Sequence, residues 1–509
     1  MLTKNIPYII IQAGGKGTRL EHLTENKPKA LVSIHGKPNI FHIMSQFKKA
    51  HFFIIGDYKK EVFKSYLQLF ASQKYTFIEA SGHGTASGIA QSLKLIPKHA
   101  PVLITWCDLY VRGAFLPEKL DLKCNYIGLS NNLFICRWRF RKGVLEEESS
   151  QRLGVAGVYL FKDKEEITSI PKSGEFCQYL RDKKIEMRPI QLKNVQEFGM
   201  INLYKKVIKR FANTRPFNQI SLENKIVTKT AIDKQGKKLA ILEGGWYEKI
   251  VNQNLAFVPK IYQINPLKMQ YVEGVSLHKF KTDKSTKKKI LLQITYNLKK
   301  LHTLYGTIPS ITSNDHEALL GKTKTRLDSI ASLIPDINRE TFIINGVECI
   351  NFYKNWNLVE NLVSKHFGSC YTFIHGDPTF SNTMIDKNGK IFFIDPRGYF
   401  GKIKLFGDED YDWAKLYYSL VGNYDQLNNK NFRISMNNGR IQLKIQSNRW
   451  EFLEMTFFSE ICRSQEKIKI YHAIIWLSLT SYIWDDYDAV CASFYNGMRL
   501  MQEIYAKTT

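Results

Sequence analysis

Three oxygen-bearing side chains lie near one another in the sequence of the C-terminal half. They are Asp377 in a His-Gly-Asp segment, Asn382 five residues later, and Asp395 at the end of the apolar run 391–394. A carboxylate can accept the proton of a hydroxyl group, and carboxylate and amide oxygens are ligands that Mg²⁺ accepts in proteins. We therefore expect the three groups to converge on Mg²⁺.

The spacing of Asp377 and Asn382 is similar to that of the kinase catalytic loop, and Asp395 stands where the metal-binding Asp of kinases would stand. Together with Asp-Pro-Arg-Gly at 395–398, the motif resembles the choline kinase and aminoglycoside phosphotransferase superfamily. The resemblance implies that Asp377 is catalytic, that Asn382 and Asp395 bind Mg²⁺, and that Asp412 braces the catalytic loop. A hairpin capped by Asp and Asn is the structural alternative.

The same resemblance implies an ATP-binding lobe upstream. Lys229 fits the strand lysine that contacts the ATP phosphates, with Lys225 as a rival, and Glu243 in the following helix could pair with it. Residues 269–277 resemble the hinge that meets adenine. The chain has no G-x-G-x-x-G loop at this position, so we expect residues 215–225 to cover the phosphates less tightly.

A second set of residues follows the apolar run at the N-terminus. Glycines leave backbone N–H groups free to curl round a triphosphate, and Lys and Arg neutralise its charge and that of the leaving pyrophosphate. The set comprises Gly14, Gly15, Lys16, Gly17, Thr18, Arg19 and, a few residues later, Lys29.

The sequences G-G-x-G-T-R-L and K-P-K-A-L in this set resemble the signature of the nucleotidyltransferases that make NDP-sugars and CDP-alcohols. The resemblance extends over residues 1 to about 210 and implies that Lys16, Arg19 and Lys29 are catalytic and that the glycines and Thr18 bind the nucleotide. It further implies a nucleobase-recognition turn at Gly84 and Thr85, an Mg²⁺ ligand at Asp108, and acceptor contacts at Gly157 and Glu175. A strand-end Asp that caps a turn is the structural alternative for Asp108.

The second Mg²⁺ ligand departs from the pattern of that family. The family usually carries Asp in a D-x-G-T context, whereas this chain has Glu197-Phe198-Gly199. Glu197 can still bind Mg²⁺, but its longer side chain requires a shifted backbone, and a surface Glu is the alternative.

The pattern of apolar segments predicts an α/β fold. Residues 1–213 alternate apolar strands with amphipathic helices, which is typical of a Rossmann-like, mostly parallel sheet with ligands at the carboxyl ends of the strands. A helix over 205–211 and a strand pair that turns at Glu223-Asn224 follow. Beyond Lys284 we expect helices and one non-helical island at 371–398. The resemblance implies a bilobal, protein-kinase-like phosphotransferase, with an N-lobe at 214–278 and a C-lobe at 279–509.

The amino-acid composition limits the classes of molecule that the chain is expected to bind. The chain has 509 residues, 73 Lys and Arg against 47 Asp and Glu, and a net charge of +26. These cations are dispersed and no nucleic-acid motif is present, so we expect small-molecule substrates and nucleotides rather than nucleic acid. No apolar run predicts membrane insertion, and eight Cys without a C-x-x-C pair favour reduced thiols in the cytoplasm. The sequence leaves the oligomeric state undecided, and a homo-oligomer is one alternative.

The two resemblances together predict consecutive steps of one route. The C-terminal half would phosphorylate a small alcohol or sugar with ATP, and the N-terminal half would join the product to a nucleotide from a second NTP, with Mg²⁺ at both sites. We favour CTP and a donor for capsule or lipooligosaccharide assembly, with UTP, GTP or dTTP as alternatives. A second alternative is that only one half is catalytic and the other is a binding or regulatory module.

Overall fold

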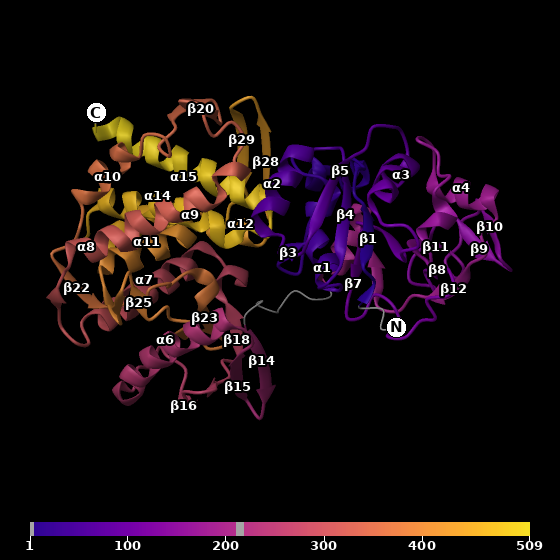
Figure 1. Ribbon diagram of the computed structural model, residues 1–509. Helices are drawn as coiled ribbons and strands as arrows, with labels where there is room; N and C mark the ends of the chain where they lie inside the picture. Colours follow the sequence, from indigo (N-terminus) through magenta and orange to yellow (C-terminus); the bar gives the residue numbers. More distant parts are fainter. Residues whose placement is uncertain (1–4, 210–217, 509) are drawn as a thin grey trace. The chain divides into compact units, whose positions relative to one another are not determined.

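The computed structural model describes residues 5–209 and 218–508 (Figure 1). Contacts divide the chain into two units, Met1–Asn213 with Asp485–Tyr487 and Thr214–Trp484 with Asp488–Thr509. The predicted boundary at residue 213 falls outside the described residues. Within the two described ranges, no helix combines the length and apolar character that crossing a membrane requires.

The first unit is built on a seven-stranded sheet with the order β12-β8-β11-β6-β1-β4-β5. Only β11 runs antiparallel to its neighbours, because the pairs β5–β4, β4–β1, β1–β6 and β8–β12 are parallel. The strands are β1 (Tyr8–Gln12), β4 (His51–Gly56), β5 (Tyr75–Glu79), β6 (Val102–Trp106), β8 (Tyr126–Leu129), β11 (Val155–Phe161) and β12 (Arg188–Gln191). The mostly parallel sheet that the sequence predicts is therefore present.

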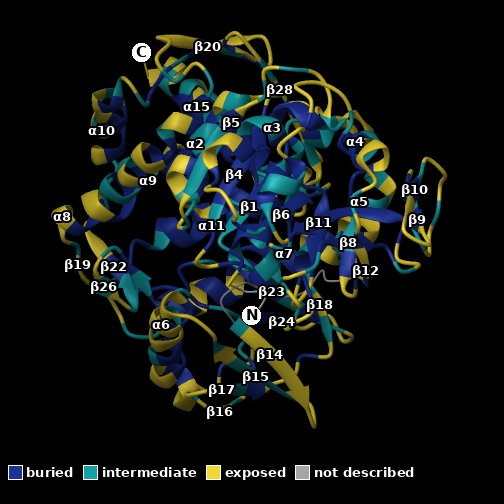
Figure 2. Cartoon of the chain, turned by 45° about the vertical axis from the view of Figure 1, so that its right-hand side comes forward, coloured by how far each residue is buried: buried dark blue, intermediate teal, exposed yellow. Residues whose placement is uncertain are grey.

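Helices cover both faces of this sheet. Ile9, Ile10 and Ile11 of β1 are all fully buried, which requires cover on both sides, and Figure 2 colours the neighbouring β4 as buried. The helices are α1 (Asn39–Ser45), α2 (Lys60–Phe70), α3 (Thr85–Leu95), α4 (Phe176–Lys183) and α5 (Ile201–Lys209). The predicted helix over 205–211 is α5, which begins at Ile201, and residues 210 and 211 lie outside the described residues.

Short elements extend the carboxyl edge of the sheet. After β6 the chain passes through Cys107 and Asp108 into β7 (Leu109–Val111), which pairs antiparallel with β13 (Val195–Glu197). This pairing brings residues 108 and 197 together from distant parts of the sequence. The other short elements of the unit are η2 (Thr18–Thr24), η3 (Lys29–Leu31), β2 (Ser33–Ile34), β3 (Lys37–Pro38), β9 (Arg139–Arg141), β10 (Val144–Glu146) and η4 (Lys164–Ile167).

The second unit begins with an antiparallel sheet of order β14-β15-β17-β16. Its elements are β14 (Asn218–Glu223), β15 (Ile226–Ala231), α6 (Lys234–Ile250), η5 (Val251–Gln253), β16 (Ile261–Gln263) and β17 (Leu267–Gln270). Glu223 pairs with Ile226, so the turn is Asn224-Lys225 and the predicted turn at Glu223-Asn224 is wrong by one residue. Both turn residues have positive φ, 48° and 60°, as a tight hairpin turn requires.

Helices dominate the rest of the second unit. They are α7 (Lys284–His302), α8 (Thr312–Asp315), α9 (Lys322–Ile330), α10 (Trp356–Ser364), α11 (Glu409–Leu420), α12 (Tyr424–Asn428), α13 (Glu454–Ile461), α14 (Gln465–Leu479) and α15 (Tyr487–Thr508). Between them, β18 (Gly274–Ser276), β23 (Thr383–Asp386) and β24 (Ile391–Phe393) form a small sheet, and β22 (Cys370–Phe373) precedes the His-Gly-Asp segment.

A second non-helical region, which the sequence analysis did not expect, interrupts these helices. Strands β20 (Thr341–Ile344), β21 (Val347–Ile350), β28 (Phe432–Asn437) and β29 (Arg440–Ile445) form one sheet in the order β21-β20-β29-β28. Its two hairpins turn at Asn345-Gly346 and Asn438-Gly439, and all four residues have positive φ. The expectation of a single island is wrong, because Asn-Gly between alternating apolar residues is a strong hairpin signal.

Candidate functional site

The first candidate site begins with the loop after β1, where Gly14, Gly15 and Thr18 also lie. Gly17 has a φ of 68°, and a Cβ there would lie 3.2 Å from both Lys29 Cβ and Thr24 Cγ2. Thr24 Oγ1 donates a hydrogen bond to the Gly17 carbonyl at 3.0 Å. Lys16 and Arg19 are exposed on this loop. Lys29 and Thr24 therefore hold the loop at Gly17, while Lys16 and Arg19 face solvent, where an anionic ligand can reach them.

Asp108 lies at the same edge of the sheet. β1 and β6 are parallel neighbours with Gln12 beside Trp106, and the Cys107 N–H donates to the Gln12 carbonyl at 3.1 Å. The loops that follow the two strands consequently meet. Lys29 Nζ donates to Asp108 Oδ2 in an ion pair of two largely buried side chains.

Glu197 approaches the same point from β13. A Cβ added to Gly199 would lie 2.9 Å from both Asp108 Oδ2 and Glu197 Oε1, and 3.1 Å from Lys29 Nζ. The two carboxylates and the amine thus surround the Cα of Gly199. The β7–β13 pairing and a residue without a side chain together supply the space that the longer Glu needs.

The electrostatics of this cluster suit a divalent cation. Burial raises the pKa of the Glu197 carboxyl and Asp108 raises it further, while Lys29 and Arg19 oppose both effects. Burial lowers the pKa of Lys29, but Asp108 and other acidic groups outweigh it, so the pKa is raised. Two neighbouring carboxylates fit Mg²⁺, which takes one or two carboxylates and completes its shell with phosphate and water oxygens. In the described ranges, no cluster of three or more His, Cys, Asp or Glu could hold a metal.

The predicted nucleobase turn and the predicted acceptor residue Glu175 lie on adjacent loops. Gly84 has a φ of 81°, and a Cβ there would lie 2.3 Å from the Gly174 carbonyl oxygen. Thr85 Oγ1 accepts a hydrogen bond from the Phe176 N–H at 2.9 Å. Glu175 itself is partly exposed and forms an ion pair with Arg137 at 3.0 Å.

Gly157 has a separate packing role. It lies on β11 with a φ of 74°, and a Cβ there would be 3.0 Å from the Trp106 ring. The packing of β11 against β6 is therefore sufficient reason for a glycine at this position.

The second candidate site contains Lys229 of β15. Its Nζ lies 2.7 Å from Glu243 Oε2 and 2.9 Å from Asp395 Oδ1, and all three side chains are less than one-fifth exposed. The predicted pairing of Lys229 with Glu243 is confirmed. Lys225 lies in the exposed hairpin turn, where it pairs with Glu273, so the structure separates the two lysines that strand alternation could not.

Asp395 holds a backbone conformation that is uncommon for a side chain. Its φ is 55°, in the left-handed region, where Asp is tolerated better than most residues. Such conformations concentrate at functional sites, where the surrounding structure maintains them. Burial lowers the pKa of Lys229, but Asp395 and Glu243 outweigh it and raise the pKa.

Asp377 and Asn382 are joined directly. Asn382 Nδ2 donates to the Asp377 backbone carbonyl at 3.0 Å and to Asp377 Oδ2 at 3.1 Å. The Ile394 N–H donates to the Asn382 carbonyl at 2.9 Å, which places Asp395 beside the loop. The structure therefore gathers Asp377, Asn382, Asp395, Lys229 and Glu243 into one site.

Asp412 supports the loop from beneath. Its side chain is fully buried and accepts hydrogen bonds from the backbone N–H groups of His375 at 2.8 Å and Gly376 at 2.7 Å. It also lies 3.1 Å from Nε2 of His302. The predicted bracing role of Asp412 is confirmed.

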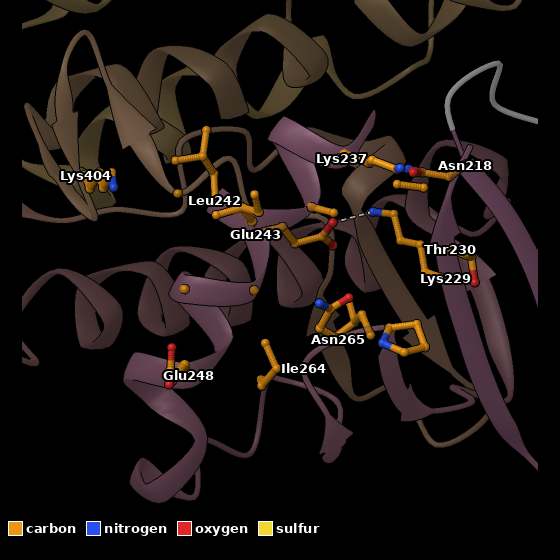
Figure 3. A pocket seen from close by; sticks show the side chains of 18 of the residues that line it. Asn218, Lys229, Thr230, Lys237, Leu242, Glu243, Glu248, Ile264, Asn265 and Lys404 are labelled. Carbon is orange, nitrogen blue, oxygen red and sulfur yellow. Dashed lines mark hydrogen bonds and ion pairs between the residues drawn. The ribbon is translucent and has the colours of Figure 1, made fainter. Parts of the chain in front are cut away.

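A pocket of about 780 Å³ lies on the α6 side of the Lys229–Glu243 pair. Figure 3 shows Lys229 and Glu243 pointing toward each other at its wall, with Ile264 and Asn265 nearby. The predicted hinge 269–277 includes the end of β17 and all of β18. Of the predicted phosphate cover, 218–223 is β14, and residues 215–217 lie outside the described residues.

Comparison with known proteins identifies part of the first unit. Residues 8–118 match the family model described as nucleotidyl transferase. Residues 8–118 therefore belong to a nucleotidyltransferase domain. This range contains the glycine-rich loop, Lys29, the turn at Gly84 and Asp108.

Curated relatives match short stretches of the chain. The chain is 36% identical over 86 residues to the bifunctional protein GlmU of Methanocaldococcus jannaschii, which covers 16% of this chain and 20% of that protein. It is 35% identical over 100 residues to the D-glycero-alpha-D-manno-heptose 1-phosphate guanylyltransferase of Campylobacter jejuni, which covers 18% of this chain and 45% of the relative. The chain thus spans less than half the length of either relative.

A solved structure is similar to part of the chain. The CTP:phosphocholine cytidylyltransferase from Streptococcus pneumoniae is 19% identical, with a TM-score of 0.35, over 40% of this chain and 99% of that one.

Sequence reasoning missed one buried residue of the nucleotidyltransferase domain. Asn39, which is fully buried, donates from Nδ2 to the carbonyl oxygens of Cys107 at 2.8 Å and Leu109 at 3.0 Å. It fixes the backbone on both sides of Asp108. In the sequence it is indistinguishable from an ordinary residue at the start of a helix.

It also missed two cations beside Asp377. Lys415 Nζ lies 3.0 Å from Asp377 Oδ1, and the backbone N–H of Arg397 donates to the His375 carbonyl at 2.8 Å. Burial opposes ionisation of Asp377, but Lys415 and Arg397 outweigh it and hold its pKa well below the usual range. Arg397 could have been suspected from Asp-Pro-Arg-Gly, and Lys415 from its position three residues after Asp412 in a segment that continues the kinase resemblance.

Proposed function

We propose that the chain is a bifunctional enzyme that phosphorylates a small alcohol or sugar and then joins the product to a nucleotide. The observation that supports it best is the contact of Lys229 with both Glu243 and Asp395, beside Asp377 and Asn382, in a chain whose residues 8–118 match nucleotidyl transferases. This arrangement fits an ATP-dependent phosphotransferase with an N-lobe at 214–278 and a C-lobe at 279–509.

In the first step, the acceptor hydroxyl attacks the γ-phosphorus of ATP and ADP leaves. Asp377 is ionised and held in place by Asn382 and Lys415, so it can orient the hydroxyl and accept its proton. Lys229, positioned by Glu243, would hold the α- and β-phosphates. Asn382 and Asp395 would be the oxygen donors for Mg²⁺ at this site.

In the second step, a phosphate oxygen of the product attacks the α-phosphorus of the second NTP and pyrophosphate leaves. Lys16, Arg19 and Lys29 would stabilise the charge that builds on the phosphates, and the glycine-rich loop would cradle them. Asp108 and Glu197 would hold Mg²⁺, which supplies positive charge to the reacting phosphates when bound. Gly84 and Thr85 would meet the base, and Gly157 and Glu175 would contact the acceptor.

CTP is our first choice for the second NTP, since kinases and cytidylyltransferases of the resembling families act in surface-polysaccharide decoration. One relative is named for a guanylyl transfer to a heptose 1-phosphate, which keeps GTP, and with it UTP and dTTP, in the test. The second candidate function is a single active half. Glu197 in place of the usual Asp makes the first unit the weaker candidate for catalysis.

The test is a coupled panel on the full chain. Protein with ATP-Mg²⁺ and each of CTP, UTP, GTP and dTTP is scored for ADP and pyrophosphate over a set of alcohols and sugars. We expect pyrophosphate only when ATP and one acceptor are both present. ADP without pyrophosphate, for an acceptor shown to be phosphorylated, would leave a single-function kinase. Pyrophosphate from a supplied phosphorylated acceptor, without ADP from any free acceptor, would leave a single-function nucleotidyltransferase.

A further inference from the structure

Three cations lie around one phenol next to Asp377, and a fourth lies one helical turn from the first of them. Lys322 and Arg326 lie one turn apart on α9, Lys415 is on α11, and Arg397 follows β24. Lys322 Nζ and Lys415 Nζ lie 5.6 Å and 5.8 Å from the centre of the buried Tyr411 ring, and Arg397 Nη1 donates to the Tyr411 hydroxyl at 3.3 Å. Three separate segments thus contribute positive charge to one place, and α9, α11 and α14 pack together there (Figure 1).

In the described part of the chain, no ion pair joins Lys322, Arg326 or Arg397 to a carboxylate, although the charge of Arg397 acts on Asp377. Lys415 pairs with Asp377. Arg326 instead donates to the carbonyl and hydroxyl oxygens of Ser478, at 2.7 Å and 3.0 Å, and Arg397 to a phenol. Elsewhere in the same unit, cations of comparable burial have acids, as Lys467 does with Asp408 and Asp410. Like charges one helical turn apart, as in Lys322 and Arg326, are destabilising, so packing alone does not account for them.

The titration of the surrounding groups reflects the excess charge. Burial, together with Arg397, Arg326 and Lys415, lowers the pKa of Lys322 to about 8. Burial alone would raise the pKa of Tyr411, but Lys322, Lys415 and Arg397 outweigh it and lower the pKa to about 7. Both pKa shifts have the direction expected where positive charges outnumber negative charges.

We infer that this cluster binds the anionic group of the acceptor, so that the molecule phosphorylated beside Asp377 is a hydroxyl compound carrying a carboxylate or a phosphate. The inference rests on the proposed function and narrows its acceptor. A cationic acceptor such as an amino alcohol would meet Lys322, Arg326 and Arg397 and is disfavoured, although the motif resembles choline kinases, whose acceptor is a cation. Lys415 contacts Asp377, and its charge is therefore assigned to the transferred phosphoryl group rather than to the acceptor's anionic group.

The test compares acceptors of equal skeleton and different charge on the full chain. Glycerate, glycerol and serinol form a three-carbon set, and gluconate, sorbitol and N-methylglucamine form a six-carbon set. Glycerol 3-phosphate separates phosphate from carboxylate. ADP release gives kcat/KM, and the thermal shift of the protein with each compound gives binding that does not depend on turnover. We expect anions to exceed their neutral and cationic partners by about tenfold or more, since charge-assisted hydrogen bonds are the strong ones.

Lys322→Gln is the decisive variant, and Lys324→Gln is its matched control. Lys324 lies on the same helix and pairs with Asp328 at the surface. Lys322→Gln should raise KM for the preferred anion about tenfold and leave KM for ATP within about twofold, because it removes a charge from the acceptor side only. Lys324→Gln should change neither value.

Each outcome decides between the two claims. Turnover of amines or neutral alcohols in preference to their anionic partners overturns the inference and leaves the proposed kinase intact. An equal rise in KM for ATP in Lys322→Gln also overturns it, because the cluster would then serve the nucleotide. Anion binding that Lys322→Gln weakens, without ADP from any compound, keeps the anion site and overturns the kinase. If no compound binds and none is turned over, both claims are overturned.

Discussion

The two candidate sites place a lysine against an aspartate in the same way but hold it by different means. In the first unit, Lys29 meets Asp108 where Gly199 leaves room for Glu197. In the second unit, Lys229 meets Asp395, and the neighbouring loop rests on the buried Asp412. One site depends on empty space at a glycine, and the other on a buried charge that fixes the backbone.

This difference indicates how each site should fail. At the first site, which depends on space beside Gly199, added atoms should displace the site's side chains and change the rest of the unit little. A site made by a buried brace loses stability when the brace is neutralised, because backbone donors and a charged partner remain buried without it.

The largest expected effect separates the two chemistries. Asp377→Asn should lower ADP formation by about 10³-fold, since a general base contributes about 10²–10⁴-fold. It should leave pyrophosphate release from a supplied phosphorylated acceptor unchanged. Asp108→Asn should do the opposite. The measurement is the initial rate of each product, and a substitution that removes both activities would show that the two sites are not independent.

The next effect tests the brace. Asp412→Asn should lower the free energy of unfolding of the second unit by about 3–5 kcal/mol, because one amide oxygen cannot replace a carboxylate that serves two backbone N–H groups and His302. Urea denaturation measures the change. Asp328→Asn, which removes an exposed partner of Lys324, is the control and should cost less than about 0.5 kcal/mol. Equal effects of both variants would contradict a brace.

Local sequence patterns predicted much of the fold and of both sites. The alternation of apolar segments was enough for the parallel sheet, and the two family resemblances nominated the neighbours of Asp108 and of Asp377. Alternation could not separate Lys229 from Lys225, because a strand that included both would place them on the same face, whereas Lys225 lies in the turn before β15. The hairpins at Asn345-Gly346 and Asn438-Gly439 were not predicted, although Asn-Gly between alternating apolar residues is a clear local signal for a hairpin.

What the sequence could not show comes from contacts between distant segments. Gly199 acquires its importance only when β13 pairs with β7, and the cations around Tyr411 come from three segments without a shared motif. Asn39 supports Asp108 from 69 positions away, through hydrogen bonds to the two flanking carbonyl groups. Such relations depend on tertiary packing, which spacing along the chain does not encode.

A smaller effect should appear in the pH dependence of stability. The hydrogen bonds and charges of Asp412 and Glu409 outweigh the burial of His302 and raise its pKa to about 9, above the ordinary value near 6.5. The stabilisation is therefore complete below about pH 6.5 and is lost as pH rises through 9, with a size on the order of 2–3 kcal/mol. The unfolding free energy of His302→Gln should differ most from that of the natural protein at pH 6 and least near pH 9.5. A difference that does not change with pH would mean that the buried His302 is neutral.

The smallest expected effect tests the clearance at the first site. In Gly199→Ala, the new methyl group would lie 2.9 Å from oxygens of Asp108 and Glu197 and must displace at least one of them. We expect pyrophosphate release to fall about tenfold, in line with the cost of about 1–3 kcal/mol for crowding a packed site, while ADP formation is unchanged. Met200→Ala is the matched control, because the neighbouring Met200 side chain is 39% exposed and should tolerate truncation. Full nucleotidyl transfer by Gly199→Ala would show that the two carboxylates need not approach each other, and Glu197 would then have no place among the Mg²⁺ ligands.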